Sequence, residues 1–261
     1  MSTNHQNNRI KPHGVARVIS KRGFCSRSVA ENLVREGRVS LRGKIVRDPE
    51  TPTFESDEIL VDGAPVTASE FLYFAMNKPR GIVTTASDEK GRKTVMDLFR
   101  EQYSKMFPGR PVPHISPVGR LDAASEGLLL FTNDTKWADA LLDPKDSGSG
   151  AGMTTHIKIY RVQVKGILTA DDLAKMEAGF NVPPRVFGES EEFMHAERAA
   201  LHSEGEKNCW LEITLSEGKN REIRRMLAHL GYEVMRLMRT QFDKYTLGNL
   251  KPGEIREIKP R

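Results

Sequence analysis

The apolar run Leu-Leu-Leu-Phe at residues 128–131 constrains the fold of this 261-residue chain more than any other segment. Gly127 precedes the run, and the turn-forming sequence Thr-Asn-Asp follows it at residues 132–134. A short, uninterrupted apolar run between such residues predicts a β-strand that is buried on both faces. We therefore expect residues 128–131 to form the best-buried strand of the chain.

Arg120 and Asp122 lie two residues apart in the turn-rich segment that leads into this strand. A loop anchored by a buried strand holds a side chain in place yet leaves it accessible, which suits a reactive carboxylate. Asp122 is also a residue type that commonly stabilises turns or caps helices, and its spacing alone favours that structural role.

The composition, with 38% hydrophobic and 29% charged residues, is that of a soluble globular protein. No segment approaches the roughly 20 apolar residues that a membrane helix needs. The polar N-terminus has no apolar core of a secretory signal, and residues 1–13 are expected to be a disordered lead-in. Cys25 and Cys209 are too few for a disulfide framework and have no metal-ligand spacing. We expect a cytoplasmic protein with no membrane partner.

Positive charge is concentrated near the N-terminus. Residues 9–48 contain eleven Lys or Arg against three Asp or Glu, a net charge of +8, whereas the whole chain carries +5. The remaining residues therefore sum to −3. A basic block on a mildly acidic body favours a module that binds a polyanion, although an ordinary solvated surface is a common alternative.

The basic block has its own pattern of elements. Residues 15–19 predict a short helix ended by Gly23, and residues 29–34 predict a second helix that follows a Ser cap and ends at Gly37. Residues 38–46 predict a hairpin that turns at Arg-Gly. This unit, with its run GFCSRSVAENLVREGRV, resembles the S4-type RNA-binding module, which we place at residues 14–68. Such modules present arginines to phosphates, and the candidates are Arg27, Arg35, Arg38 and Arg42.

The segment GRLDAASEGLLLFTND at residues 119–134 resembles the signature of the ribosomal RNA pseudouridine synthases of the RsuA family. Three more segments resemble that family's motifs: NKPRGIVTT at 77–85, KIYRV at 158–162 and EGKNREIRRM at 217–226. The resemblance implies an α+β fold. A small S4-type module would precede a catalytic domain, residues 70–261, built on a mixed, mostly antiparallel sheet flanked by helices.

The resemblance also implies roles for individual residues. Asp122 corresponds to the catalytic carboxylate, and Tyr160 to a Tyr that stacks on the target base. Arg224 corresponds to an Arg that pairs with the Asp, which it would keep ionised from about 4–6 Å away. Leu237 corresponds to an apolar residue near the Tyr, and Arg120 could fill the gap left by a flipped uridine.

Each of these assignments has a structural alternative. The alternating strand expected at residues 156–164 places Tyr160 on a face with valines, so a core Tyr is equally open. A helix expected from about residue 220 places Arg221, Arg224 and Arg225 on one cationic face, which could contact RNA or only water. Lys78 could contact an RNA phosphate, but a scaffold role is favoured. Residues 82–85 are expected to form a strand, residues 145–152 a flexible Gly/Ser-rich loop, and residues 181–205 an irregular surface.

Isomerising uridine breaks the bond between base and ribose and rejoins the base through carbon 5, with no atoms gained or lost. The reaction therefore requires no redox cofactor or energy source, and we expect no cofactor and no metal. A carboxylate beside the sugar can act as nucleophile or as base, and the sequence leaves both roles open. The expected partner of this monomeric enzyme is ribosomal RNA or a pre-ribosomal particle.

Two other functions are considered. A non-catalytic ribosome-assembly factor would keep the RNA-binding surface, but it would be free to lose the Asp, Tyr and Arg that are all present here. A nuclease would need a carboxylate cluster or a His pair at metal-binding spacing, and the sequence has no recognisable one.

Overall fold

The computed structural model describes residues 12–67, 70–85, 88, 91–142, 156–184 and 190–260. The chain divides into two compact units. One comprises residues up to Leu72 with the short segments 113–115 and 133–135, and the other comprises the remainder. The predicted lead-in, up to residue 11, and the predicted Gly/Ser-rich loop lie outside the described residues. No helix in the described ranges combines the length and the apolar character needed to cross a membrane.

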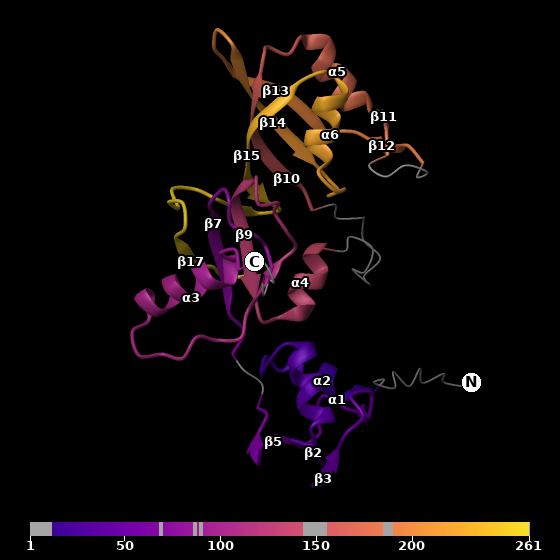
Figure 1. Cartoon of the computed structure of the whole chain (residues 1–261), viewed down its shortest axis with the longest axis vertical. Coiled ribbons are helices and arrows are strands. Elements are labelled where there is room, and N and C mark those ends of the chain that lie inside the picture. Colours follow the sequence, from indigo (N-terminus) through magenta and orange to yellow (C-terminus); the bar gives the residue numbers. More distant parts are fainter. Residues whose placement is uncertain are drawn as a thin grey trace, which may run out of the picture. The chain divides into compact units, whose positions relative to one another are not determined.

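The first unit packs two helices against a small sheet (Figure 1). Helix α1 (Val15–Lys21) contacts α2 (Arg27–Arg35), and the Ser26 side chain caps α2 by accepting a hydrogen bond from the backbone N–H of Val29. The sheet has the order β3-β2-β5-β6. Its strands are β2 (Val39–Leu41), β3 (Lys44–Val46), β5 (Ile59–Val61) and β6 (Ala64–Pro65), and β1 (His13–Gly14) pairs separately with β4 (Pro52–Thr53).

The β2–β3 hairpin turns at Arg42 and Gly43, which both have positive φ angles, 51° and 76°. Two such residues form the tight turn whose twist matches that of the flanking strands. Fully buried side chains from the helices and the sheet, including Ile19, Val34 and Val39, form the core of this unit. The predicted helix–helix–hairpin order is confirmed.

The second unit is built on a nine-stranded sheet with the order β13-β14-β10-β15-β9-β7-β17, to which β16 adds beside β15 and β8 beside β9. All pairings within it are antiparallel except that of β9 with β15, which is parallel. The predicted α+β class with a mixed, mostly antiparallel sheet is confirmed. The strands are β7 (Tyr73–Lys78), β8 (Ser116–Val118), β9 (Glu126–Thr132), β10 (Lys158–Lys165), β13 (Arg198–Glu204), β14 (Asn208–Leu215), β15 (Glu233–Phe242), β16 (Tyr245–Thr246) and β17 (Ile255–Glu257).

Helices α3 (Val95–Met106) and α4 (Thr135–Leu142) lie on opposite sides of β7 and β9 (Figure 1). Helices α5 (Ala170–Ala178) and α6 (Glu222–His229) lie beside the other half of the sheet, together with the separate ribbon of β11 (Phe180–Val182) and β12 (Glu192–Met194).

Strand β9 is buried on both faces, as its apolar run predicts. Residues 128–131 have no exposed surface. The ring of Phe131 stacks on Phe99 of α3 with centroids 5.2 Å apart, whereas Leu128 and Leu130 belong to a cluster with Leu141 of α4. Covering both faces removes the need for polar residues, which explains the uninterrupted run.

The parallel contact between β9 and β15 is short. It pairs Glu126 with Met238 and Gly127 with Arg239. Gly127 has a φ angle of 102°, and a Cβ atom at this position would lie 2.3 Å from the carbonyl oxygen of Arg239. Glycine is therefore the only residue that allows the two strands to approach here.

Two predicted segments differ in the structure. In residues 82–85, Val83 forms only an isolated bridge with Thr94, because Gly81 turns the chain with a φ angle of 90° and Thr84 bonds a neighbouring loop. The described part of residues 181–205 is not irregular, since it contains β12 and β13. Strand β13 is an edge strand whose last three residues, His202, Ser203 and Glu204, are exposed and polar, so it lacks the apolar alternation of a half-buried strand.

Candidate active site

A cleft of about 440 Å³ opens in the second unit. It is lined by the loop before β9, by residues on β10 and β15, and by the turn before α6. Five of the predicted site residues line it: Arg120, Asp122, Tyr160, Arg221 and Leu237. The fold thus gathers residues from distant motifs into one cavity.

Asp122 and Arg221 form an ion pair at this cleft. Arg221 Nη1 lies 3.4 Å from Asp122 Oδ2, and the two side chains are 41% and 39% exposed. A pair this exposed contributes at most about 1 kcal/mol to stability. Its importance is that it orients the carboxylate while leaving it accessible to a substrate.

Arg221 reaches Asp122 because helix α6 begins later than predicted. The φ angle of Arg221 is 52°, which is left-handed, so the helix starts at Glu222 instead of near residue 220. A non-glycine residue in this conformation is uncommon and is held by its surroundings. The backbone turns sharply at Arg221, and its side chain is therefore at the cleft while the next arginines lie within the helix.

Arg224 does not make the predicted ion pair with Asp122, and this prediction is corrected. Its Nη2 donates to the carbonyl of Ala124 at 3.0 Å, and its Nη1 donates to the carbonyl of Val234 at 3.2 Å. Burial lowers the pKa of Arg224, while the nearby Asp122 acts in the opposite direction. Arg224 therefore holds the loop after Asp122 and interacts with the carboxylate only through space.

Lys78 anchors the same loop from below the surface. It has no exposed area, and its Nζ donates to the carbonyls of Asp122 at 3.1 Å and Ser125 at 2.8 Å. Burial lowers the pKa of Lys78 to about 8, although Asp122 and Glu126 partly oppose this shift. The structure agrees with the favoured scaffold role of Lys78 and not with the alternative RNA contact, because a side chain without exposed surface has none to offer a phosphate.

The segment NKPRGIVTT supplies two further anchors. Thr84 Oγ1 donates to the carbonyl of Leu121 at 2.6 Å, and the backbone N–H of Gly81 donates to the carbonyl of Ala123 at 2.7 Å. Each backbone carbonyl from residue 121 to residue 124 is thus bonded by a group from residues 78–84, by Ser125 N–H or by Arg224. These bonds fix the backbone that carries Asp122.

Tyr160 stands on β10 opposite Arg239 of β15 and Ile213 of β14. Its side chain is 9% exposed and shares a face with Val162, which is fully buried. The register also pairs Val162 with Leu237. The Tyr is thus both a core residue and part of the cleft wall, so the two readings of its sequence position are compatible.

The remaining predicted cations divide between the cleft and its surroundings. Arg120 is exposed at the cleft and makes no hydrogen bond or ion pair with any residue in the described ranges. Arg225 lies outside the cleft, where its Nη1 is 2.5 Å from Glu192 Oε2 and its Nη2 donates to the carbonyl of Pro183. The predicted single cationic face is therefore wrong, because Arg221, Arg224 and Arg225 have three different sets of partners.

Four charged residues of the cleft were not among the predicted site residues: Lys158, Lys219, Glu222 and Arg239. The lining thus has five Lys or Arg against two acids, an environment that favours an anionic substrate. Lys158 could have been predicted, since it lies two residues before Tyr160 on the same face of an alternating strand. The other three reach the cleft only through tertiary packing.

Glu222 is a buried acid in the wall of the cleft. It is 3% exposed, and burial together with Glu217 raises its pKa to about 8. Its Oε2 accepts a hydrogen bond from the backbone N–H of Lys219 at 3.1 Å. Glu222 thereby closes the turn that ends at Arg221, next to the ion pair with Asp122.

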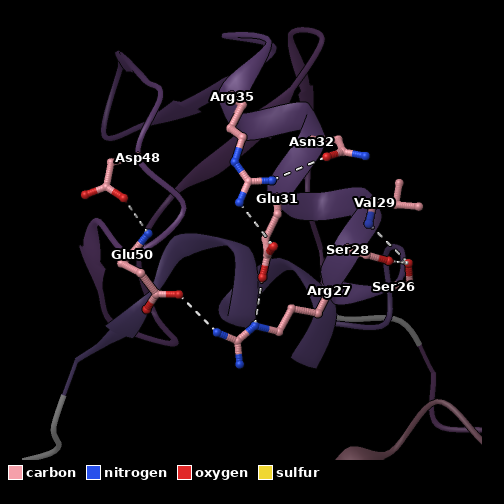
Figure 2. A network of polar contacts seen from close by, with 9 residues as sticks. All are labelled: Ser26, Arg27, Ser28, Val29, Glu31, Asn32, Arg35, Asp48 and Glu50. Carbon is pink, nitrogen blue, oxygen red and sulfur yellow. Dashed lines mark hydrogen bonds and ion pairs between the residues drawn. The ribbon is translucent and has the colours of Figure 1, made fainter.

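In the first unit, Arg27 and Arg35 both point at Glu31 (Figure 2). Arg27 Nε lies 3.2 Å from Glu31 Oε1, and its Nη2 lies 3.0 Å from Glu50. Arg35 Nη2 lies 3.4 Å from the other oxygen of Glu31. These pairs are exposed, so phosphate oxygens can replace the carboxylates at little cost.

Arg38 and Arg42 have their own acidic partners. Arg38 Nη2 lies 2.6 Å from Asp62, and Arg42 Nη2 lies 2.5 Å from Asp57. The arginine in each pair lowers the pKa of its partner carboxyl. All four predicted phosphate-binding arginines are therefore exposed at the surface and bonded to acids of the same unit.

Comparisons with known proteins relate both units to described families. The model of the RNA pseudouridylate synthase family matches residues 72–229, and that of the S4 domain matches residues 15–59. A ribosomal large subunit pseudouridine synthase B from Bacillus subtilis is 36% identical over 245 residues, covering 94% of this chain and 91% of the relative.

An uncharacterised RNA pseudouridine synthase from Rickettsia felis is 34% identical over 251 residues, covering 94% of this chain and 96% of its own. A crystal structure of a pseudouridylate synthase superposes with a TM-score of 0.59 at 26% identity, covering 95% of this chain and 96% of that one. The similarity therefore extends over both units of the chain.

Proposed function

The chain belongs to the RNA pseudouridylate synthase family and carries an N-terminal S4 domain, and from this premise we propose that it converts a uridine of ribosomal RNA to pseudouridine with Asp122 as the catalytic carboxylate. One observation carries the assignment of the carboxylate. Asp122 is the acid of the cleft that is both accessible and paired with an arginine, whereas Glu222 is buried and its pKa is raised to about 8.

The geometry supports a different role for each residue around the ribose. Arg221 orients the carboxylate of Asp122, which either attacks carbon 1′ or removes a proton from carbon 2′. Tyr160 and Leu237 contribute the largely apolar wall on which a uracil ring can stack. Tyr160 also helps to remove the proton that leaves carbon 5 at the end of the reaction.

The target base must leave its helix before Asp122 can reach the sugar, at a cost of a few kcal/mol. Arg120 is an exposed cation at the cleft with no ion-pair partner among the described residues, and it can take the place of the flipped base. The exposed arginines of the S4 domain add phosphate contacts, which provide affinity without sequence choice. Ribosomal RNA as substrate and two free cysteines, Cys25 and Cys209, fit a reducing, cytoplasmic setting.

The test compares the wild type with Asp122→Asn on unmodified small- and large-subunit ribosomal RNA transcripts. Large-subunit RNA is the first choice because the Bacillus subtilis relative is named for it. We expect the wild type to form pseudouridine at one position and the variant to form none, with RNA binding within a few-fold of the wild type. Turnover retained by the variant would remove Asp122 from the reaction. RNA binding by a wild type that forms no pseudouridine would favour the assembly-factor alternative.

A further inference from the structure

We propose that Arg239 and Lys158 form a binding site for the uracil ring on the β10–β15 wall of the cleft and stabilise the ring as an anion while it is detached from the ribose. This site rests on the proposed isomerisation and extends it, because it names the two cations that balance the negative charge of the detached base. It applies whether Asp122 acts as nucleophile or as base.

The register of the strands places both cations beside Tyr160. Arg239 is directly opposite Tyr160 across β10 and β15, and Lys158 lies two residues before Tyr160 on the same face of β10. Phe242 is opposite Lys158, and its ring centroid is 5.3 Å from Lys158 Nζ and 5.0 Å from Arg239 Cζ. All four side chains line the cleft that contains Asp122.

Arg239 is buried and Lys158 is half-buried, and each has few polar partners among the described residues. Arg239 is 3% exposed; its Nε donates to the carbonyl of Leu128 at 2.8 Å, but its buried Nη2 has no acceptor in the part of the chain that the structure describes. Lys158 Nζ makes one long bond, 3.4 Å, to the carbonyl of Glu217. Burial and the charge of Arg239 lower the pKa of Lys158.

A buried guanidinium with an unpaired nitrogen, next to a second cation, is unfavourable because of desolvation and repulsion. Packing alone does not offset this cost. An anion or a group of carbonyl oxygens between the two would satisfy the free nitrogen and offset the repulsion. Uracil has two such oxygens, O2 and O4. The arrangement therefore fits the base better than it fits a purely structural role.

The chemistry of the reaction creates an anion at this place. When the bond between carbon 1′ and N1 breaks, its electron pair leaves with the ring, and the negative charge spreads from N1 to O2 and O4. Carbon 1′ receives electrons from Asp122, or from the C2′–H bond when Asp122 removes that proton. The turned ring then bonds carbon 1′ through carbon 5 as the bond to Asp122 breaks, or as Asp122 returns the proton to carbon 2′. The ring loses the carbon 5 proton and gains a proton on N1, so that atoms and electrons balance.

Two cations suit a ring that must turn. A single directional hydrogen bond would be broken when O2 and O4 change places, whereas two charges beside the ring attract either oxygen. Positive groups prearranged in a site shielded from water act mainly on the charge that develops during reaction. Their effect is expected on the rate of bond breaking and only weakly on RNA affinity.

The test measures single-turnover rates of Arg239→Gln and Lys158→Gln at saturating enzyme. The substrates are ribosomal RNA transcripts made with uridine or with 5-fluorouridine, and the rearranged nucleoside is resolved by chromatography after digestion. Fluorine withdraws electrons and helps the ring to carry negative charge itself. Arg161→Gln is the matched control, because Arg161 is exposed and lies on the opposite face of β10.

We expect Arg239→Gln to be slower on uridine RNA by about 10²–10³-fold, the loss typical of one removed charge-stabilising donor. On 5-fluorouridine RNA the loss should be at least about tenfold smaller, and Lys158→Gln should show the same trend. Arg239→Lys should recover part of the rate, and Arg161→Gln should behave as the wild type on both RNAs. RNA affinity should change by less than about threefold in all of them, since the ring is a small part of the interface.

Equal losses on the two RNAs would overturn the proposal, since they would show that leaving-group charge is not involved. A loss of affinity with a shallower salt dependence would also overturn it and identify a backbone phosphate as the ligand. If Arg239→Gln unfolds at too low a temperature to be assayed, the rates of Lys158→Gln on the two RNAs distinguish these outcomes. A wild type that rearranges no uridine in any transcript would contradict the proposed function itself, which these other outcomes leave intact.

Discussion

Arg221 Nη1 lies 3.4 Å from Asp122 Oδ2, although 99 residues separate the two in the chain. Arg224, three residues further on, bonds the backbone of the loop that carries Asp122. Two arginines of one motif thus act on the same carboxylate by different means. One orients the side chain, and the other holds the backbone.

The variants Arg221→Ala and Arg224→Ala should therefore differ in their effects on reaction rate and on stability. Arg221→Ala should lower the single-turnover rate by about 10–100-fold, as expected for a lost orienting contact, with a melting temperature close to that of the wild type. Arg224→Ala should lower both rate and stability, the latter by on the order of 1–3 kcal/mol, because two carbonyls lose a partly buried donor. Unfolding in denaturant and single-turnover kinetics measure the two effects, and the reverse pattern would contradict this division.

Lys78→Met should lower the turnover rate and leave RNA affinity unchanged, because the buried ammonium positions the Asp122 loop and has no surface for RNA. Its pKa of about 8 is below the 10.5 of an exposed Lys. The unfolded chain therefore binds more protons between these values, and the stability of the wild type relative to the variant should rise with pH across that window. Melting curves from pH 7.5 to 10.5 test the sign, and a falling difference would contradict it.

Glu222→Gln should stabilise the protein at alkaline pH. The folded pKa of Glu222, about 8, is above the 4.5 of an exposed Glu, so the folded chain holds an extra proton between these values and loses stability as pH rises. Glutamine imitates the protonated acid and keeps the bond from Lys219 N–H. The two proteins should melt alike near pH 5 and diverge towards pH 8.5. A variant that melts below the wild type at pH 8.5 would show that the ionised form is the one the fold requires.

Glu31→Gln should increase RNA affinity and steepen its dependence on salt. The substitution frees Arg27 and Arg35 from a shared carboxylate and removes a negative charge from a surface expected to meet phosphates. Asp171→Asn is the matched control, since it breaks a similar exposed i,i+4 pair, with Lys175, on a helix with no predicted RNA contact. Binding isotherms between about 50 and 200 mM salt compare the two. Equal behaviour of both variants would mean that the S4 arginines do not contact RNA.

Much of the fold could be predicted because local patterns and burial agree. The run at residues 128–131 is uninterrupted since helices cover both faces of β9, and the Ser cap predicted before the second helix is Ser26. Strand β13 could not be predicted, because an edge strand needs polar residues more than it needs alternation.

The sequence predicted which residues line the site better than it predicted the contacts between them. The motifs place Asp122, Tyr160 and Leu237 in one cleft, but the choice between Arg221 and Arg224 depends on a single left-handed residue that shifts the start of α6. Arg239 was hidden for another reason. Its position in an ordinary strand does not reveal that one guanidinium nitrogen has no acceptor among the described residues, which only the folded structure shows.

The close approach at Gly127 has a consequence for how the molecule folds. The strand bearing Arg239 and the strand that follows the Asp122 loop meet there over only two residue pairs, although more than a hundred residues separate them in sequence. The entropy of closing so long a loop is repaid late, after the local hairpins have formed. A refolding chain should therefore acquire most of its β-structure before it acquires activity. Because only glycine allows this approach, a side chain at position 127 should lower the yield of active enzyme and leave most of the β-structure in place.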